Sequence, residues 1–260
     1  MRSAEFIDRL AAKGRLHFTT AEAHRELGGS LGAARSALRR LEKRGLIAVP
    51  YRGFHLILPP EYRSIGCLPA AQFVPDLMTH LGLRYYAALL TAAERHGAAH
   101  QRPQRFQVMV AKNRKPIRCG SVHVEFMARH DLEHTPTQSV TTPRGTLLLS
   151  TPEATALELV GYAARCGGLD NVATVLAELA EVLAAGKLRV AARHCPISWV
   201  QRLGYLLEKA GRKALARELH PVVDRRARAL APLLRSAPRG NVPRSDRWRV
   251  LVNTAVEPEA

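Results

Sequence analysis

Two histidine-containing motifs have the residue types that bind zinc or carry out acid–base chemistry. His123-Val124-Glu125 has the His-x-Glu spacing of zinc deaminases, in which the histidine binds the metal and the glutamate moves protons. The paired cysteines that complete such a site do not follow in this sequence. His96 and His100 are four positions apart, but Gly97 between them favours a helix end, where a capping histidine is more common than a metal ligand. The sequence therefore predicts no metal site.

A second group of residues has the letter spacing of a nucleotidyltransferase motif. Cys119-Gly120-Ser121 precedes Asp131-Leu132-Glu133, and in such enzymes the Gly-Ser pair opens a helix while the acids hold a metal ion. Here the residues after Ser121 alternate between apolar and polar, which favours a strand. Glu125-Phe126-Met127 lacks the Glu-x-Lys of restriction-type nucleases, and no glycine-rich loop has phosphate-binding spacing. We expect no catalytic residues and no cofactor, and an enzyme that uses Asp131 remains an alternative.

Positive charge is the strongest chemical signal in the sequence. Its 260 residues include 39 lysines and arginines against 22 acids, for a net charge of +17. Such a surplus indicates a polyanionic partner, with nucleic acid favoured over a membrane. No apolar run approaches the roughly 20 residues that span a bilayer, and the start lacks the apolar stretch of a signal peptide. The four cysteines lack metal or redox spacing, so we expect buried thiols in a cytoplasmic protein.

The first 62 residues have the element order of a winged helix-turn-helix. Apolar spacing predicts a helix from Ser3 that ends at Gly14, and a second helix over residues 21–27. A Gly-Gly turn precedes a third helix over residues 31–44, which Ser30 can cap. Two β-rich runs between residues 46 and 58 then flank a glycine-containing turn, which predicts a hairpin, or wing.

The third helix has the two faces that DNA recognition requires. Leu31, Ala34, Leu38 and Leu41 fall on one side and should pack against the first two helices. The opposite side is polar and cationic, and arginine there could contact guanine edges. A basic helix alone could be a solvated face, but the ordered set of elements favours DNA binding. The expected DNA contacts are Ser30, Arg35, Ser36, Arg39, Arg40 and Lys43 on the helix, with Tyr51, Arg52 and His55 on the wing.

The rest of the chain predicts an α+β domain. Residues 63–69 are expected to form a linker, and residues 70–260 to form one domain. Helices are expected at 70–80 and 83–96, and strands at 106–111, 115–119, 122–128 and 146–150. Thr151-Pro152-Glu153 is typical of a helix start and opens a helical bundle to about residue 234. A closing strand is expected over 247–253. The fold class is thus a winged helix followed by a small β-sheet and a helical bundle.

Several long blocks resemble one known family, the AbiEi antitoxins. Residues 51–62, Tyr51-Arg52-Gly53-Phe54-His55-Leu56-Ile57-Leu58-Pro59-Pro60-Glu61-Tyr62, are similar to the family's wing and the segment that follows it. Residues 76–78, 85–90 and 96–104 are similar to its central signature, and residues 150–160 and 247–253 to its later blocks. The resemblance covers nearly the whole chain, with Glu158 standing where an aspartate is usual.

The resemblance implies an antitoxin of a bacterial toxin–antitoxin system linked to abortive phage infection. The winged domain of such proteins binds double-stranded promoter DNA, typically at inverted repeats, and represses its own operon. The C-terminal domain counteracts a nucleotidyltransferase-like toxin, AbiEii. In the type IV arrangement no stable complex forms, although some relatives bind their toxins, so direct binding stays open. The alternative function is a DNA-binding regulator whose C-terminal domain senses a ligand or a partner.

A second basic surface is expected around the small sheet. Three roles are open for this surface: it extends the DNA-binding surface, it binds an RNA or the toxin, or it is a solvated basic face. Its residues are Arg102, Arg105, Lys112, Arg114, Lys115 and Arg118.

Overall fold

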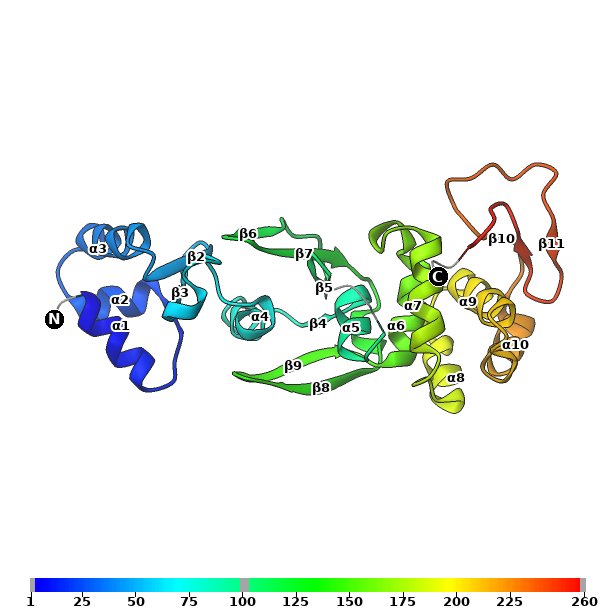
Figure 1. Cartoon of the computed structure of the whole chain (residues 1–260), viewed down its shortest axis with the longest axis horizontal. Helices are drawn as coiled ribbons and strands as arrows, with labels where there is room; N and C mark the ends of the chain where they lie inside the picture. Colours follow the sequence, from blue (N-terminus) through cyan, green and yellow to red (C-terminus); the bar gives the residue numbers. More distant parts are fainter. Residues whose placement is uncertain (1–2, 99–102, 258–260) are drawn as a thin grey trace. The chain divides into compact units, whose positions relative to one another are not determined.

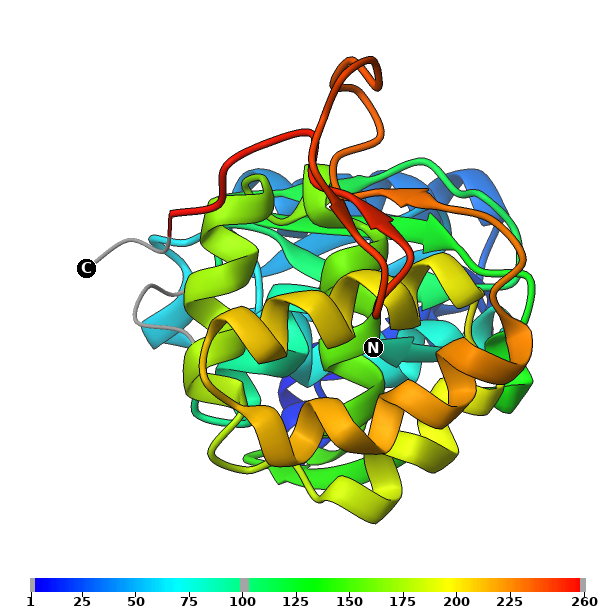
Figure 2. The ribbon, with the colours of Figure 1, turned by 90° about the vertical axis from the view of Figure 1, so that its right-hand side faces the viewer.

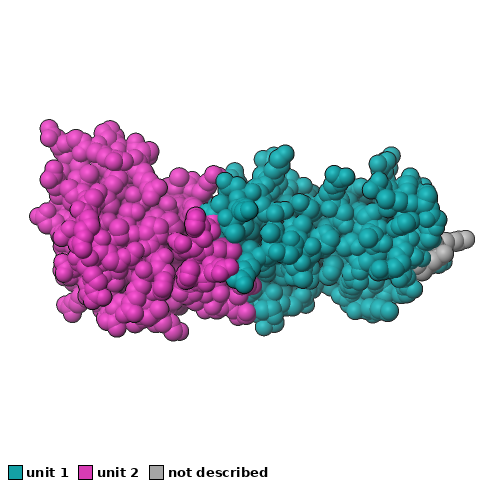
Figure 3. All heavy atoms as spheres, turned by 180° about the vertical axis from the view of Figure 1, so that it is seen from behind, with its two compact units in different colours: residues 1–85, 104–128, 140–147 teal, residues 86–103, 129–139, 148–260 magenta. Residues whose placement is uncertain are grey.

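The computed structural model describes residues 3–98 and 103–257, and its fold is mixed α+β. The chain divides into two compact units, coloured separately in Figure 3. Unit 1 comprises residues 1–85, 104–128 and 140–147, and unit 2 comprises residues 86–103, 129–139 and 148–260. This division differs from the expected boundary at residues 63–69, because unit 1 continues beyond it into the strands.

Unit 1 begins with the expected helices and a small antiparallel sheet (Figure 1). Local signals explain the helix starts: the Thr19 side chain and Glu22 form a capping box, and the Ser30 hydroxyl accepts a hydrogen bond from the Ala33 N–H. The sheet order is β1-β3-β2. The elements are α1 (Ser3–Ala12), β1 (His17–Thr19), α2 (Thr20–Leu27), α3 (Leu31–Lys43), β2 (Ile47–Tyr51) and β3 (Phe54–Ile57).

The remainder of unit 1 is a helix and a group of strands. The short helix η1 (Pro60–Tyr62) leads to α4 (Ala70–His80). Strand β7 (Val122–Ala128) pairs in parallel with β5 (Phe106–Val110) and antiparallel with β6 (Ile117–Cys119). The alternation expected of β7 holds for Val124, which is buried, and His123, which is exposed.

One hydrophobic core runs through all of these elements. Phe18 and Phe54 from the N-terminal elements belong to the same buried cluster as Phe73 of α4 and Val108 and Val124 of the strands. Cys67 and Leu68, in the expected linker, are fully or almost fully buried in it. Residues 63–69 therefore do not separate two cores.

Unit 2 begins with a strand where a helix was expected. Residues 83–96 form β4 (Tyr85–Ala87) and then α5 (Leu89–Arg95), so the expectation of a single helix was wrong. Ala87 pairs in parallel with Leu149 of β9 (Gly145–Ser150), and Leu89 has a φ of 54°, which no continuous α-helix permits. The preceding strand β8 (Thr137–Thr142) follows η2 (Leu132–His134) and, like β9, is divided between the units.

The helices of unit 2 pack around a helix that is buried along most of its length. Residues 153–160 of α6 are all buried, and α6 contacts α5, α7, α8 and α9. Figure 2 shows α9 and α10 lying side by side, in agreement with their extensive contacts. The helices are α6 (Pro152–Gly161), η3 (Ala163–Arg165), α7 (Leu169–Leu179), α8 (Ala185–Arg193), α9 (Ile197–Lys209) and α10 (Lys213–Arg226).

A small sheet closes the described part of unit 2. Its order is β10 (Ala231–Pro232), β12 (Val250–Leu251) and β11 (Arg244–Ser245). The closing strand is thus shorter than expected, because within residues 247–253 only Val250 and Leu251 form ladder pairs. The segment between β10 and β11 projects as a long loop (Figure 2). Over the described ranges, no helix has the length and apolar character that a membrane crossing requires.

Candidate functional site

Helix α3 presents a cationic face to solvent. Ala34, Ala37, Leu38 and Leu41 are buried, whereas Arg35, Ser36, Arg39, Arg40 and Lys43 are all exposed. Leu31 is 39% exposed, so the expectation that it packs against the other helices was wrong. It is the first residue of the helix and lies beyond the reach of the core. Ser30 is exposed as well, and its hydroxyl caps the helix.

The cations of this face are not neutralised by acids of the same unit. The two glutamates of α2 pair with arginines outside α3: Glu22 with Arg15 at 2.6 Å, and Glu26 with Arg9. Among the described residues, Arg35, Arg39, Arg40 and Lys43 form no ion pair. Unpaired guanidinium groups on one helix face are free to bind phosphate or base edges.

The hairpin of β2 and β3 places Arg52 at an exposed tip. Gly53 follows it with a φ of 81°, a left-handed conformation that the tight turn requires and that glycine adopts without strain. Tyr51 is half-buried, and its hydroxyl accepts a hydrogen bond from Nη2 of Arg114 at 3.2 Å. Arg52 is therefore exposed to a binding partner, whereas the Tyr51 hydroxyl is already hydrogen-bonded to Arg114.

His55 lies inside the unit, and its expected contact with DNA is corrected. Its side chain is 6% exposed, lies 5.1 Å from the Phe18 ring in a stacked arrangement, and pairs through Nε2 with Oγ1 of Thr20 at 2.9 Å. Burial lowers the pKa of His55 to about 4, so the ring is neutral at physiological pH. All four residues of β3 are buried, because this strand lies between β1 and β2 and is covered on both faces.

The second basic surface is only partly assembled as expected. Arg102 lies outside the described residues. Lys112, Lys115 and Arg118 are exposed, and Arg105 is 3.8 Å from Glu125. Arg114 instead reaches the β2–β3 hairpin, since its guanidinium lies 5.9 Å from the centre of the Tyr51 ring. The β5–β6 turn and Tyr51 of β2 also line a pocket of about 290 Å³. The structure thus brings part of this surface next to Arg52.

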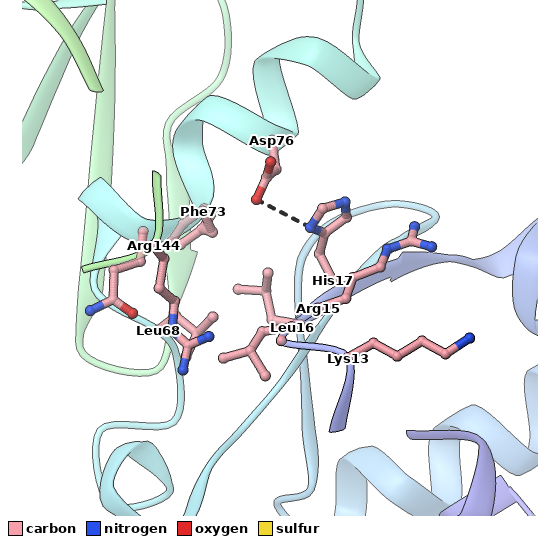
Figure 4. Close-up of a pocket in the computed structure, with 11 residues that line it drawn as sticks. Lys13, Arg15, Leu16, His17, Leu68, Phe73, Asp76 and Arg144 are labelled. Atoms are coloured by element: carbon pink, nitrogen blue, oxygen red, sulfur yellow. Dashed lines mark ion pairs between the residues drawn. The ribbon is translucent and has the colours of Figure 1, made fainter. Parts of the chain in front are cut away.

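A pocket of about 280 Å³ lies where β1 meets α4 (Figure 4). Leu16, Leu68 and Phe73 form part of its lining, and Nδ1 of His17 pairs with Oδ2 of Asp76 at 3.1 Å. Figure 4 shows the side chains of Lys13 and Arg15 extending away from the pocket, so these cations do not converge on one point. The His17–Asp76 pair links β1 to α4.

A buried polar cluster occupies the centre of unit 2. Arg129 donates to Oε1 of Glu158 at 2.5 Å, and the Tyr86 hydroxyl donates to the same oxygen at 2.6 Å. The Arg129 guanidinium also lies 5.3 Å from the centre of the Trp199 ring. Burial raises the pKa of Glu158, and the hydrogen bonds from Arg129 and Tyr86 oppose that shift. Sequence reasoning missed Arg129 and Tyr86, since their partner Glu158 lies far along the chain.

The residues with the spacing of a nucleotidyltransferase motif lie on a strand and a short helix. The residues after Ser121 form strand β7, where a nucleotidyltransferase motif would need a helix. Asp131 and Glu133 are exposed and lie at η2. Within residues 3–98 and 103–257, no cluster of three or more His, Cys, Asp or Glu side chains could hold a metal ion.

Comparison with solved structures shows a protein of similar fold. The crystal structure of the RV2827C protein from Mycobacterium tuberculosis matches this chain with a TM-score of 0.67 at 18% sequence identity, covering 96% of this chain and 90% of that chain. A nucleotidyltransferase-like antigenic protein from Paracoccidioides brasiliensis gives a TM-score of 0.37 at 10% identity, over 60% of this chain and 87% of that chain, which supports no inference. No curated protein matches the sequence.

One protein-family model matches most of unit 2 and part of unit 1. Residues 86–209 match the model of the AbiEi antitoxin C-terminal domain. The matched range includes the polar cluster of Tyr86, Arg129 and Glu158 and the helices α5 to α9. The resemblance stated from the sequence blocks is thereby confirmed over residues 86–209, the range that matches the AbiEi antitoxin C-terminal domain.

Proposed function

We propose that this antitoxin represses its own operon through residues 1–62, which act as a winged helix-turn-helix on double-stranded promoter DNA. Helix α3 is the recognition helix in this proposal, and β2 with β3 is the wing. The sites of binding are inverted repeats in the promoter, as the family resemblance implies. The observation that carries the proposal is the exposed cationic face of α3, whose arginines have no carboxylate partner among the described residues.

The chemistry of that face suits the major groove of DNA. The groove is about 12 Å wide and admits one helix. Gly32 and Ser36 are small and exposed, so they allow close approach of the α3 backbone. Arg35, Arg39 and Arg40 have the fork geometry that contacts guanine or phosphate in pairs of hydrogen bonds. Arg52 at the wing tip and Lys43 at the helix end are the proposed phosphate contacts.

We further propose that the C-terminal domain counteracts a nucleotidyltransferase-like toxin of the AbiEii type, without catalysis of its own and in the cytoplasm. The family match over residues 86–209 supports this half of the proposal. The system would then act in defence against phages, as abortive infection systems do.

The test separates the two activities by point variants in the full chain. Because one core spans residues 6 to 126, removal of one half would expose apolar surface and confound the result. Arg39→Ala with Arg40→Ala should release a promoter reporter from repression while cells stay protected from the toxin encoded beside this gene. Arg225→Ala with Arg228→Ala removes the same charge from exposed positions of unit 2 and should leave repression intact.

Each half of the proposal can fail separately in this test. Full repression by the Arg39 and Arg40 double variant would reject α3 as the recognition helix. Death of cells that co-express the toxin and the unaltered chain would reject the antitoxin role towards that toxin.

A regulator that senses a ligand or a partner is the second candidate function. A pocket of about 390 Å³ lies between α7, α9 and the segment 252–256, and its lining includes Leu176, Leu206 and Val252. Pockets of this size and apolar character hold small ligands in other proteins. A small molecule that alters promoter binding in the absence of any toxin effect would favour this candidate.

A further inference from the structure

Two of the four cysteines lie against each other in unit 1. Cys67 precedes α4 and Cys119 ends β6, so the two are far apart in the sequence. Both are free and buried in the same hydrophobic cluster, and Sγ of Cys119 lies 3.9 Å from the carbonyl oxygen of Gly66, the residue before Cys67. Cys166 and Cys195 lie in unit 2. The sequence spacing contains no redox motif, and only the fold brings this pair together.

The backbones on either side of the pair are also in contact. The Ser121 N–H donates to the Ile65 carbonyl at 2.9 Å, and Sγ of Cys119 lies 3.9 Å from the Gly66 carbonyl. A Cβ on Gly120 would lie 2.1 Å from the Ile65 oxygen, so only glycine fits there. A disulfide requires Cα atoms within about 7 Å of each other. Backbone contact between residues 65–66 and residues 119–121 holds the neighbours of Cys67 and Cys119 against each other, as such a bond needs.

The two thiols have different surroundings. Hydrogen bonds from the Cys67 thiol and from the Val49 N–H lower the pKa of Cys119, against the opposing effects of burial and of Glu42. The hydrogen bond to Cys119, together with burial, raises the pKa of Cys67. Cys119 is 8% exposed, whereas Cys67 is 0% exposed. Cys119 is therefore the better nucleophile towards an oxidant that reaches the surface.

We propose that Cys67 and Cys119 form a reversible disulfide when the protein meets a hydroperoxide. The Cys119 thiolate attacks one peroxide oxygen and breaks the O–O bond, which leaves a sulfenic acid and, after protonation, one water molecule from hydrogen peroxide. The Cys67 sulfur then attacks the sulfenic sulfur, and a second water leaves with the Cys67 proton. Two thiols are oxidised to one disulfide, and one peroxide is reduced to two waters.

The bond would join the segment before α4 to β6. That link closes a long loop of the chain. The disulfide lowers the conformational entropy of the unfolded state and leaves the folded state almost unchanged, so the free energy of unfolding rises. The oxidised protein should therefore melt several degrees above the reduced protein. Reduction by dithiothreitol should return the melting temperature to its original value.

Mass spectrometry of the full chain tests the proposal without any substitution. The protein is treated with hydrogen peroxide, denatured, and alkylated with iodoacetamide. We expect two alkylated cysteines, Cys166 and Cys195, and a peptide pair joined through Cys67 and Cys119 that dithiothreitol separates. Four alkylated cysteines, a bond between any other pair, or sulfinic acid without a cross-link would overturn the proposal.

Variants then test the roles of the two thiols. Cys67→Ala should leave Cys119 as a sulfenic acid that dimedone labels, whereas Cys119→Ala should leave Cys67 unlabelled. The matched control, Cys166→Ala with Cys195→Ala, should form the disulfide as fully as the unaltered chain. Equal dimedone labelling of Cys67 and Cys119 in the two single variants would reject Cys119 as the attacking thiol.

Discussion

Arg114 donates a hydrogen bond to the hydroxyl of Tyr51 at 3.2 Å, and its guanidinium lies over the same ring. This contact joins the β5–β6 turn to strand β2. A double-mutant cycle with Arg114→Ala and Tyr51→Phe should give a coupling of about 0.5–1 kcal/mol in the free energy of unfolding. Lys115→Ala is the matched control, since Lys115 is exposed in the same turn. Additive effects of Arg114→Ala and Tyr51→Phe would show that the contact does not form in solution.

Promoter binding should depend steeply on salt. If the protein neutralises about four phosphates, affinity should fall about 100-fold between 50 and 200 mM salt, because bound counterions are released. Lys43→Ala should reduce the slope by about one unit, and Arg39→Ala should cost about 1–3 kcal/mol with loss of sequence preference. Fluorescence anisotropy with labelled promoter DNA measures both quantities. A flat salt response would contradict the proposed cationic interface.

Stability should fall in acid because His55 is buried in its neutral form. The unfolded chain protonates this histidine near pH 6.5, whereas the folded chain does so only at about 4. Between these values the unfolded state binds more protons, so the free energy of unfolding falls as the pH drops. The contribution is complete above pH 6.5 and amounts to at most about 3 kcal/mol.

His55→Gln removes the titrating group and retains a polar side chain. The variant should flatten the pH dependence of urea unfolding between pH 4 and 6.5, even if it is less stable at pH 7. An unchanged pH profile in the variant would assign the acid sensitivity to other groups.

Loss of Arg129 should strongly destabilise unit 2. Arg129→Met leaves the Glu158 carboxylate buried without its ionic partner, which costs about 3–5 kcal/mol. Glu158→Leu in the same chain removes the stranded charge, so the double variant should be more stable than Arg129→Met alone. Urea unfolding followed by tryptophan fluorescence measures the free energy of unfolding of the two variants and shows which is more stable. A double variant less stable than the single one would mean that the pair acts through packing alone.

Gly204 of α9 has no room for a side chain. A Cβ there would lie 2.1 Å from the Trp248 ring, so Gly204→Ala should lower stability by about 1–3 kcal/mol through overpacking. Gly186 of α8 is the matched control, because a Cβ there meets nothing within 4 Å. Gly186→Ala should be neutral or stabilising by up to about 1 kcal/mol. Equal melting temperatures for the two variants would contradict the close contact of Trp248.

Local signals in the sequence explain which elements could be predicted. Caps at Thr19 and Ser30, together with glycine turns, specify the N-terminal helices from residues only three or four positions apart. Alternation also identified β7, whose neighbours lie on both sides. The family blocks predicted an antitoxin domain, and residues 86–209 match the model of that domain.

Contacts between distant residues explain what the sequence did not show. The strand at Tyr85–Ala87 depends on pairing with Leu149, and local propensity alone favoured a helix. Burial of His55 follows from its contacts with Phe18 and Thr20, which lie far from it in the sequence. The approach of Cys67 to Cys119 likewise requires the fold.

Both tryptophans of this chain, Trp199 and Trp248, are buried in unit 2, and unit 1 has none. Indole fluorescence is therefore a natural optical label for unit 2 alone, while circular dichroism records the backbone of both units. Melting followed by the two signals at once would tell whether the halves of the protein unfold in concert or in succession. No foreign fluorophore has to be introduced for that measurement.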